Sequence, residues 1–439
     1  MSLVPSEVHP TIARSMLADG FDIVLDLARS HGSWIVDAQT GTRYLDMFTF
    51  FASSALGMNH PGLTEDEQFR SELLLAAYNK PSNSDMYTVA MAEFVQTFTR
   101  VLGDDRLPHL FFIEGGANAV ENALKTAFDW KSRLNEACGR DPRLGMRVMH
   151  LNDAFHGRTG YTLSLTNTEP IKTARFPKFD WPRITNPYPG TDRSGHARDI
   201  EMLEEHALEQ ARAVFAKNPH DIACFIAEPI QGEGGDHHLR AHFLQAMQDL
   251  CHKNDTLFIL DEVQTGCGMT GSAWAYQQLG LEPDVIAFGK KTHVCGIMAG
   301  GRVDEIPDNV FHVSSRINST FGASLTDMVR ARRILEIIET SDLIRRAKDL
   351  GTHLVARLQE VASRHPIVTD PRGRGLMCAV TLADGGVRDE VLRELRIREH
   401  VLLLPCGERS VRFRPSLTVT KDELDAAVSA LDRTLLRHR

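Results

Sequence analysis

Two side chains with complementary chemistry stand at the ends of short aliphatic runs in the second half of the chain. Asp261 follows the run Leu257–Leu260, and Lys290 lies two residues beyond the run Val285–Phe288. Such runs are typical of buried parallel strands, and open α/β sheets bind ligands at the carboxyl ends of their strands. A lysine amine placed there can form a Schiff base with an aldehyde, and a carboxylate can pair with a protonated ring nitrogen. Together they are the two groups that an enzyme using pyridoxal 5'-phosphate requires.

Each of these residues alone also has a structural interpretation. Asp261 could cap a helix, and Lys290 could be a solvated charge in a loop. Their occurrence together, and in the company of further motifs, favours the catalytic interpretation.

A pair of glycines offers a place for the phosphate. Gly115 and Gly116 follow the expected strand Leu110–Ile113 and let the backbone approach an anion. The next helix points its free N–H groups and positive dipole end at that position, so Gly116 and Ala117 are the predicted main-chain donors. By itself, the same pattern also fits a simple strand-to-helix turn.

Two other segments resemble nucleotide-binding motifs and fail on spacing. The glycines of Gly232–Gly235 are followed by no helix and ribose-binding acid at the required distance. Gly289–Thr292 resembles the end of a P-loop, but Asp284 stands where the earlier glycine is required. The sequence therefore does not predict a nucleotide hydrolase.

Five residues near the ends of other apolar runs are candidate binding groups. Phe155 offers a flat face for a cofactor ring, and Arg158 can hold a carboxylate with two parallel hydrogen bonds. Glu228, Glu233 and Arg412 are charged residues in comparable positions. Taken alone, Phe155 would more often pack in a core, and the charged residues would more often form surface ion pairs.

Length and composition limit the function classes. The 439 residues, 42% of them hydrophobic, suffice for a large core and more than one domain. The net charge is -9 and the basic residues form no block, so no nucleic-acid partner is expected. The seven cysteines form no C-x-x-C pair, which fits reduced thiols, and no ligand set predicts a metal. No membrane-spanning run or signal peptide is recognised, which predicts a cytoplasmic protein without membrane association.

The order of the expected elements predicts an α/β fold with a smaller second unit. Between about Ser84 and Phe321 helices and strands alternate, which is typical of a mainly parallel sheet wrapped by helices. From about Leu325 onward, helices cover one face of a small sheet, which indicates a second domain that a hairpin near residues 34–46 joins. We therefore expect an N-terminal segment over residues 1–60, a large domain over 61–324 and a small α+β domain over 325–439.

Taken in order, seven motifs resemble those of the class III aminotransferases, which have the fold type I architecture of pyridoxal phosphate enzymes. Within that class, residues 173–182 and 288–296 are similar to the L-lysine 6-aminotransferases rather than the ornithine or γ-aminobutyrate enzymes. One departure is the segment after Lys290, where most of the class has a glycine-rich loop. The seven motifs span most of the chain and are Glu114-Gly115-Gly116-Ala117, Phe155-His156-Gly157-Arg158, Glu228-Pro229-Ile230-Gln231-Gly232-Glu233, Asp261-Glu262-Val263-Gln264-Thr265-Gly266, Gly289-Lys290, Ser319-Thr320-Phe321 and Arg412-Phe413.

The resemblance implies a role for each cofactor-binding residue. Lys290, and not Lys291, matches the Schiff-base lysine, because the family pattern has a small residue before the lysine and an acid six residues earlier. Thr320 would reach the phosphate in the other subunit's site, which implies a homodimer. The remaining roles are ring-nitrogen partner for Asp261, donor to the ring hydroxyl for Gln264, ring stacking for Phe155, and phosphate binding for Gly116 and Ala117.

The resemblance also implies the reaction, in which the terminal (ε) amine of L-lysine moves to 2-oxoglutarate and yields 2-aminoadipate 6-semialdehyde and L-glutamate. Arg158 would hold the distal carboxylate of both substrates, and Arg412 the carboxylate beside the keto group. Glu233 would pair with Arg412 while lysine reacts and swing away for the keto acid. Asn318 and Glu228 would complete the lysine pocket and ring surroundings.

Two alternatives to this reaction stay open. One is an ornithine or other ω-amine aminotransferase with the same cofactor. The other is a catalytically silent scaffold protein of the same fold, which the presence of Asp261, Gln264, Lys290 and Arg412 disfavours.

Overall fold

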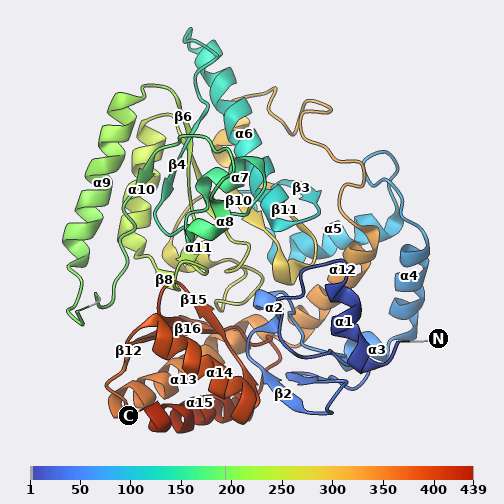
Figure 1. The fold of residues 1–439 in the computed structure, drawn as a ribbon. Helices are drawn as coiled ribbons and strands as arrows, with labels where there is room; N and C mark the ends of the chain where they lie inside the picture. The colour runs from blue at the N-terminus through green and yellow to red at the C-terminus, as the bar shows by residue number, and fades with distance from the viewer. Residues whose placement is uncertain (1–2, 193, 439) are drawn as a thin grey trace.

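The computed structural model describes residues 3–192 and 194–438, and its centre is a seven-stranded sheet (Figure 1). Five neighbouring strands, β10 to β5 in the order below, run parallel, while β11 pairs antiparallel with both β10 and β3. The predicted fold class, α/β with a mainly parallel sheet, is therefore confirmed. In spatial order the strands are β3 (His109–Ile113), β11 (Cys295–Ala299), β10 (Val285–Phe288), β9 (Leu257–Asp261), β6 (Ile222–Ala227), β4 (Arg147–Leu151) and β5 (Arg183–Ile184).

Alternate side chains of the central strands enter two separate cores. In β9, Phe258 and Leu260 join one apolar cluster, whereas Leu257 and Ile259 join the other. Successive strand residues point to opposite faces, so a strand covered on both sides must be apolar throughout. The helices that contribute to the first cluster include α5 (Val89–Leu102), α10 (Ala241–Lys253) and α12 (Leu325–Thr340), and α6 (Gly116–Ala137) contributes to the second.

Strand β11 is not among the elements expected from the sequence. The segment Cys295–Ala299 is short and contains small residues, which hides its strand character, yet it fills the gap between β10 and β3. As a result Lys290 lies in the tight connection between two antiparallel strands of the central sheet.

A second unit contains a four-stranded antiparallel sheet with helices α13 (Leu343–Arg364), α14 (Gly385–Arg398) and α15 (Lys421–Leu435). Helices α13 and α14 contact strands of this sheet, and α15 packs on both helices. In spatial order the strands are β12 (Val368–Arg374), β13 (Met377–Leu382), β16 (Ser410–Phe413) and β15 (Leu404–Cys406).

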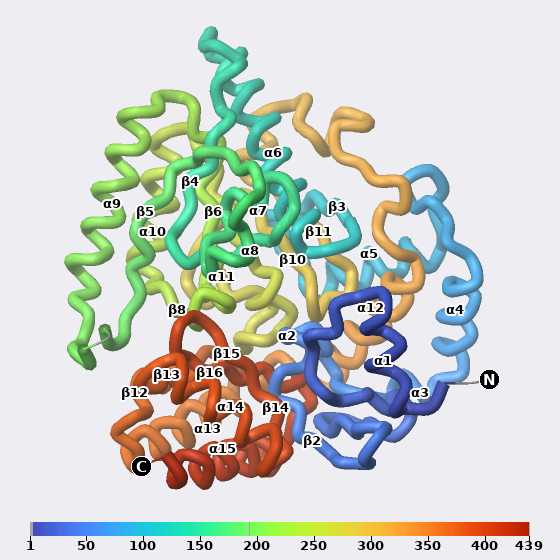
Figure 2. Tube along the Cα trace, viewed as in Figure 1, coloured from blue at the N-terminus to red at the C-terminus, as the bar shows by residue number. Residues whose placement is uncertain are grey.

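The N-terminal hairpin lies beside this second unit (Figure 2). Strands β1 (Trp34–Val36) and β2 (Arg43–Asp46) pair antiparallel, and β14 (Val401–Leu402) adds to β2 in parallel. Strands from the N-terminal and C-terminal parts of the chain thus form one small sheet. The remaining elements are η1 (Pro5–Glu7), α1 (Val8–Ala13), α2 (Thr49–Ala52), α3 (Pro61–Thr64), α4 (Glu67–Tyr78), α7 (Gly160–Leu165), α8 (Pro170–Thr173), α9 (Ile200–Lys217), β7 (Ile230–Gln231), β8 (His237–His238), α11 (Ala275–Leu279), η2 (Lys290–Thr292), η3 (Gly301–Glu305) and η4 (Leu436–His438).

Within the described ranges, every helix is too short or too polar to span a bilayer.

Candidate active site

Lys290 lies just beyond the carboxyl end of β10, in the 3-10 turn η2 that leads to β11. Its φ of 55° falls in the left-handed region, which is unfavourable for a lysine and is tolerated where the surroundings fix the backbone. Burial lowers the pKa of its ammonium group, although the nearby carboxylate of Asp261 acts in the opposite direction. A larger share of Lys290 is therefore neutral near pH 7 than of a free lysine, which suits a nucleophile or a base.

Asp261 ends the neighbouring strand β9, directly beside β10, and is buried. Its Oδ1 accepts a hydrogen bond from the Val263 N–H at 3.1 Å, and its Oδ2 lies 2.8 Å from His156 Nδ1. Burial opposes the charged imidazole, but the carboxylates of Asp261 and Glu228 outweigh it and raise the pKa of His156. His156 is thus a buried hydrogen-bond partner for Asp261, and its raised pKa favours the protonated imidazole more than in a free histidine.

Glu228 connects two loops of the site. One of its oxygens accepts from the Phe155 N–H and the other from the Gly232 N–H, both at 3.0 Å. Burial raises the pKa of Glu228 to about 7. The structure therefore gives this residue a clear part in positioning Phe155 and the loop that carries Glu233.

Gln264 is fixed by a buried ion pair. Its side-chain oxygen accepts from Arg414 Nε at 3.0 Å, and Arg414 also donates to Asp236, which is fully buried. The amide NH2 of Gln264 is thereby left as the donor, as its implied role requires. Gly232 lies so near that a Cβ there would come within 2.4 Å of this amide, so the close approach requires glycine.

The pair Gly115 and Gly116 begins a long helix without a side-chain cap. Helix α6 starts at Gly116, and its N-cap Gly115 has a φ of 92°, which favours glycine. The first N–H groups of this 22-residue helix, those of Gly116 and Ala117, are therefore available to an anion.

Arg412 on β16 is nearly inaccessible to solvent, with 2% of its side chain exposed. Its Nη2 lies 2.8 Å from Glu233 Oε2, and its guanidinium lies 5.7 Å from the ring of Phe51. Within the described residues, Arg412 Nε has no hydrogen-bond partner. An unpaired buried N–H is costly and is suited to an added acceptor such as a carboxylate oxygen.

Among the described residues, no hydrogen bond or ion pair links Arg158, Asn318 or Thr320 to this buried cluster. All three are exposed on the single chain. Asn318 Oδ1 accepts from the Ser319 N–H at 2.8 Å, and the Thr320 carbonyl accepts from Ser82 Oγ at 2.6 Å.

Lys291 is a buried structural residue and not a surface neighbour of Lys290. It is 1% exposed, and its Nζ donates to the carbonyl oxygens of Ala52 at 2.9 Å and Gln264 at 3.3 Å. Ala52 ends a left-handed turn, α2, in which Phe50 and Phe51 also have positive φ. Lys291 thus anchors the strained turn that presents Phe51 to Arg412.

Sequence reasoning missed several residues of this cluster. The motif that contains Phe155 also contains His156, so its place beside Asp261 had a local signal. Lys172 and the pair Asp236–Arg414 had none, because their partners lie far away in the chain.

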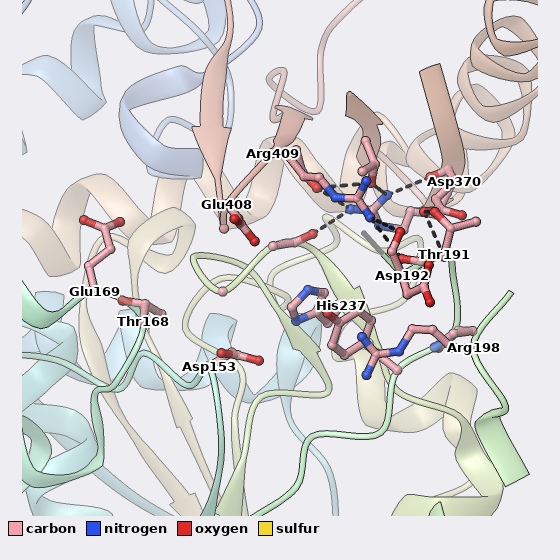
Figure 3. Close-up of a pocket in the computed structure, with 18 residues that line it drawn as sticks. Asp153, Thr168, Glu169, Thr191, Asp192, Arg198, His237, Asp370, Glu408 and Arg409 are labelled. Atoms are coloured by element: carbon pink, nitrogen blue, oxygen red, sulfur yellow. Dashed lines mark hydrogen bonds between the residues drawn. The ribbon is translucent and has the colours of Figure 1, made fainter. Parts of the chain in front are cut away.

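A separate cavity of about 650 Å³ does not include Lys290 (Figure 3). It lies between the large unit and the strands of the second unit, and its lining contains acidic and basic side chains, among them Asp153, Glu169, Arg198 and Asp370. Gly234 and Gly235 also line it, so it adjoins the loop that carries Glu233.

The residues around Lys290 fit pyridoxal 5'-phosphate. The amine of Lys290, with its lowered pKa, suits the aldehyde of the cofactor. The buried carboxylate of Asp261 suits the protonated ring nitrogen. The N-terminus of α6, which has no side-chain cap, suits the phosphate.

Comparisons with known proteins agree with this chemistry. The family model of the class-III aminotransferases matches residues 17–435. The chain is 64% identical over 434 residues to the L-lysine-epsilon aminotransferase of Mycobacterium tuberculosis, covering 98% of this chain and 96% of the relative. It is 58% identical over 432 residues to that of Streptomyces clavuligerus, covering 98% and 94%. The solved structure of lysine aminotransferase from M. tuberculosis in the internal aldimine form matches with a TM-score of 0.97 and 63% identity over 100% of both chains.

Proposed function

The chain belongs to the class III aminotransferases, enzymes that use pyridoxal 5'-phosphate, and we propose that it transfers the ε-amine of L-lysine to 2-oxoglutarate. The products would be 2-aminoadipate 6-semialdehyde and L-glutamate. The names of its relatives at 58–64% identity support the choice of lysine. The observation that carries the proposal is the 2.8 Å contact between Glu233 and Arg412, because it shields a carboxylate-binding arginine from an amino acid that must react at its far end.

When bound, the cofactor supplies an aldehyde for the substrate amine and a conjugated ring that accepts the electrons of a carbanion. Lys290 would hold it covalently, Asp261 would pair with its ring nitrogen, and Phe155 would lie on its ring. Gln264 would donate to the ring hydroxyl, and the N–H groups of Gly116 and Ala117 would bind the phosphate.

Lys290 would also act as the base. With a substrate bound, the lysine Nζ would remove a proton from the carbon that carries the reacting amine and return it elsewhere. Only the neutral amine can take that proton, and the lowered pKa of Lys290 supports this step.

Asp261 would keep the ring nitrogen protonated, and His156 would hold its carboxylate in place. The buried hydrogen bond of 2.8 Å between them fixes the direction of the carboxylate. This arrangement supports the electron-withdrawing state of the ring without movement of the protein during the reaction.

The two arginines would bind different carboxylates of the substrates. Arg158 would hold the distal carboxylate of either substrate, and Asn318 would assist in the lysine pocket. Arg412 would bind the carboxylate beside the keto group once Glu233 has moved. While Glu233 stays paired with Arg412, the α-carboxylate of lysine would bind Arg158 and not Arg412, so the ε-amine would reach the reacting centre.

We also propose a homodimer and a cytoplasmic location. The exposure of Thr320 on the single chain supports a role in the site of a second subunit, at the phosphate. We propose in addition that the large domain extends from residue 61 to residue 324, between the N-terminal segment and the small domain.

A substrate panel tests the proposed reaction. Turnover dependent on 2-oxoglutarate is measured with lysine, ornithine and γ-aminobutyrate as donors. The proposal expects the highest kcat/KM with lysine and a product that retains the α-amine. A higher kcat/KM with ornithine or another ω-amine would instead support the alternative of an ornithine or other ω-amine aminotransferase.

A further inference from the structure

Lys172 of helix α8 is a second cation on the carboxylate of Glu233. Its Nζ lies 2.6 Å from Glu233 Oε1, while Arg412 Nη2 lies 2.8 Å from Oε2. One carboxylate thus joins two cations, each through a different oxygen. Burial opposes the charged carboxylate, but Arg412 and Lys172 outweigh it and lower the pKa of Glu233.

This geometry bears on how Glu233 can leave Arg412. Glu233 occupies Nη2 of the buried Arg412 and leaves Nε unpaired, so a substrate carboxylate can bind both nitrogens with parallel hydrogen bonds only if Glu233 moves away. A carboxylate that leaves its cation inside a protein without meeting another is left uncompensated, which strongly disfavours the movement. The Oε1 atom, however, is already on Lys172, so rotation away from Arg412 keeps one ion pair intact.

The surroundings of Lys172 hold it in this position. Its Nζ lies 3.1 Å from Glu169 Oε1 and 5.4 Å from the centre of the Phe155 ring. Its own side chain is 15% exposed, whereas that of Glu169 is 52% exposed. Lys172 is therefore fixed on one side by a solvated carboxylate and on the other by the aromatic face beside the cofactor site.

Space for the movement lies next to this pair. Glu169 and Gly234, the neighbours of Lys172 and Glu233, both line the cavity of about 650 Å³ (Figure 3). This cavity adjoins the ion-pair cluster, so we expect the Glu233 side chain to turn toward it when it leaves Arg412.

We propose that Lys172 is a positioning residue that retains Glu233 whenever the carboxylate of the keto acid occupies Arg412. Lys172 thereby allows one pocket to bind lysine in the first half-reaction and the keto acid in the second. The inference rests on the proposed function, because it assumes that Arg412 is shielded for lysine and exposed for 2-oxoglutarate.

Substitution Lys172→Met tests this role in the holoenzyme, with the two half-reactions followed separately by cofactor absorbance. Glu233 then has one cation fewer and stays with Arg412. The KM for 2-oxoglutarate is expected to rise roughly tenfold, with kcat and the lysine half-reaction changed less than about twofold. Lys172→Arg is expected to keep the wild-type KM, and Lys172→Gln to give an intermediate value. Lys178→Met is the matched control, because this exposed lysine lies six residues away with its Nζ 3.5 Å from Thr173 Oγ1, and it is expected to leave both half-reactions unchanged.

A double variant separates the proposed role from a structural one. In Lys172→Met combined with Glu233→Gln, a neutral amide no longer holds Arg412, so the KM for 2-oxoglutarate is expected to return toward the wild-type value. Equal losses in both half-reactions of Lys172→Met, or no recovery in the double variant, would overturn the inference. If wild-type enzyme does not use lysine, the proposed function is wrong. If it does, and Lys172→Met keeps its affinity for 2-oxoglutarate, only the role of Lys172 is wrong.

Discussion

His156 Nδ1 lies 2.8 Å from Asp261 Oδ2 in a fully enclosed part of the site, and both side chains are buried. The carboxylate that would pair with the cofactor ring is therefore itself held by a residue of the loop that carries Phe155. One hydrogen bond couples the ring-stacking loop to the end of strand β9.

Substitution His156→Phe is expected to remove the buried hydrogen-bond partner of Asp261 and leave the Oδ2 atom of its carboxylate unpaired. The free energy of unfolding should fall by about 3 kcal/mol, and both half-reactions should slow at least tenfold, roughly the effect of 1.4 kcal/mol on a barrier. Urea unfolding and stopped-flow absorbance measure the two effects. His150→Phe is the control, since His150 is equally buried but has no carboxylate partner among the described residues. Equal kinetics in the two variants would contradict the role of His156.

Substitution Glu233→Gln is expected to expose Arg412 to the α-carboxylate of lysine. The share of product that has lost the α-amine should then increase by about tenfold, since an unpaired buried guanidinium strongly favours a new carboxylate partner. Chromatographic separation of the semialdehyde from the α-keto acid measures it, with Glu305→Gln, at an exposed position, as the control. Wild-type regiochemistry in Glu233→Gln would argue against the shielding of Arg412.

The two arginines should differ in which half-reaction they affect. Arg412→Met is expected to raise the KM for 2-oxoglutarate by about 100-fold, the loss of a charge-assisted contact of 2–3 kcal/mol, and to affect the lysine half-reaction much less. Arg158→Met should weaken both substrates. The kinetics of each half-reaction are measured separately for the two variants. Equal effects of Arg412→Met and Arg158→Met on both half-reactions would refute the different roles of the two arginines.

Lys291 should make stability depend on pH. Burial lowers its pKa from 10.5 to about 7, so between these values the unfolded chain binds more protons than the folded one. The free energy of unfolding should therefore rise with pH from 7 toward 10.5, with a contribution from Lys291 of up to about 1.4 kcal/mol per pH unit. Lys291→Met should remove that contribution. Urea unfolding at pH 7 and pH 9, at a fixed protein concentration, tests it, and parallel profiles for the two proteins would contradict it.

The strand ends that carry Asp261 and Lys290 could be predicted because continuous aliphatic runs bounded by polar residues report burial on both faces of a sheet. The uncapped glycine start of α6 was predictable from local sequence for a similar reason. Both features depend on neighbours in the chain.

Features that depend on distant partners could not be predicted. The contacts of Glu233 with Lys172 and of Asp261 with His156 join residues 61 and 105 positions apart. The left-handed turn at Phe50 and Phe51 contradicts the backbone preference of aromatic residues and is held from outside, by Lys291 and by the bond from Thr49 Oγ1 to the Arg414 carbonyl.

We propose that Lys290, and not the adjacent Lys291, carries the cofactor. The most direct test is to treat the enzyme loaded with pyridoxal 5'-phosphate with borohydride, which fixes the cofactor on the lysine to which it is attached, and to locate the added mass by peptide fragmentation. We predict the label on Lys290, its loss together with transamination in Lys290→Ala, and its retention in Lys291→Met. Label on Lys291, or full transamination by Lys290→Ala, would contradict the account.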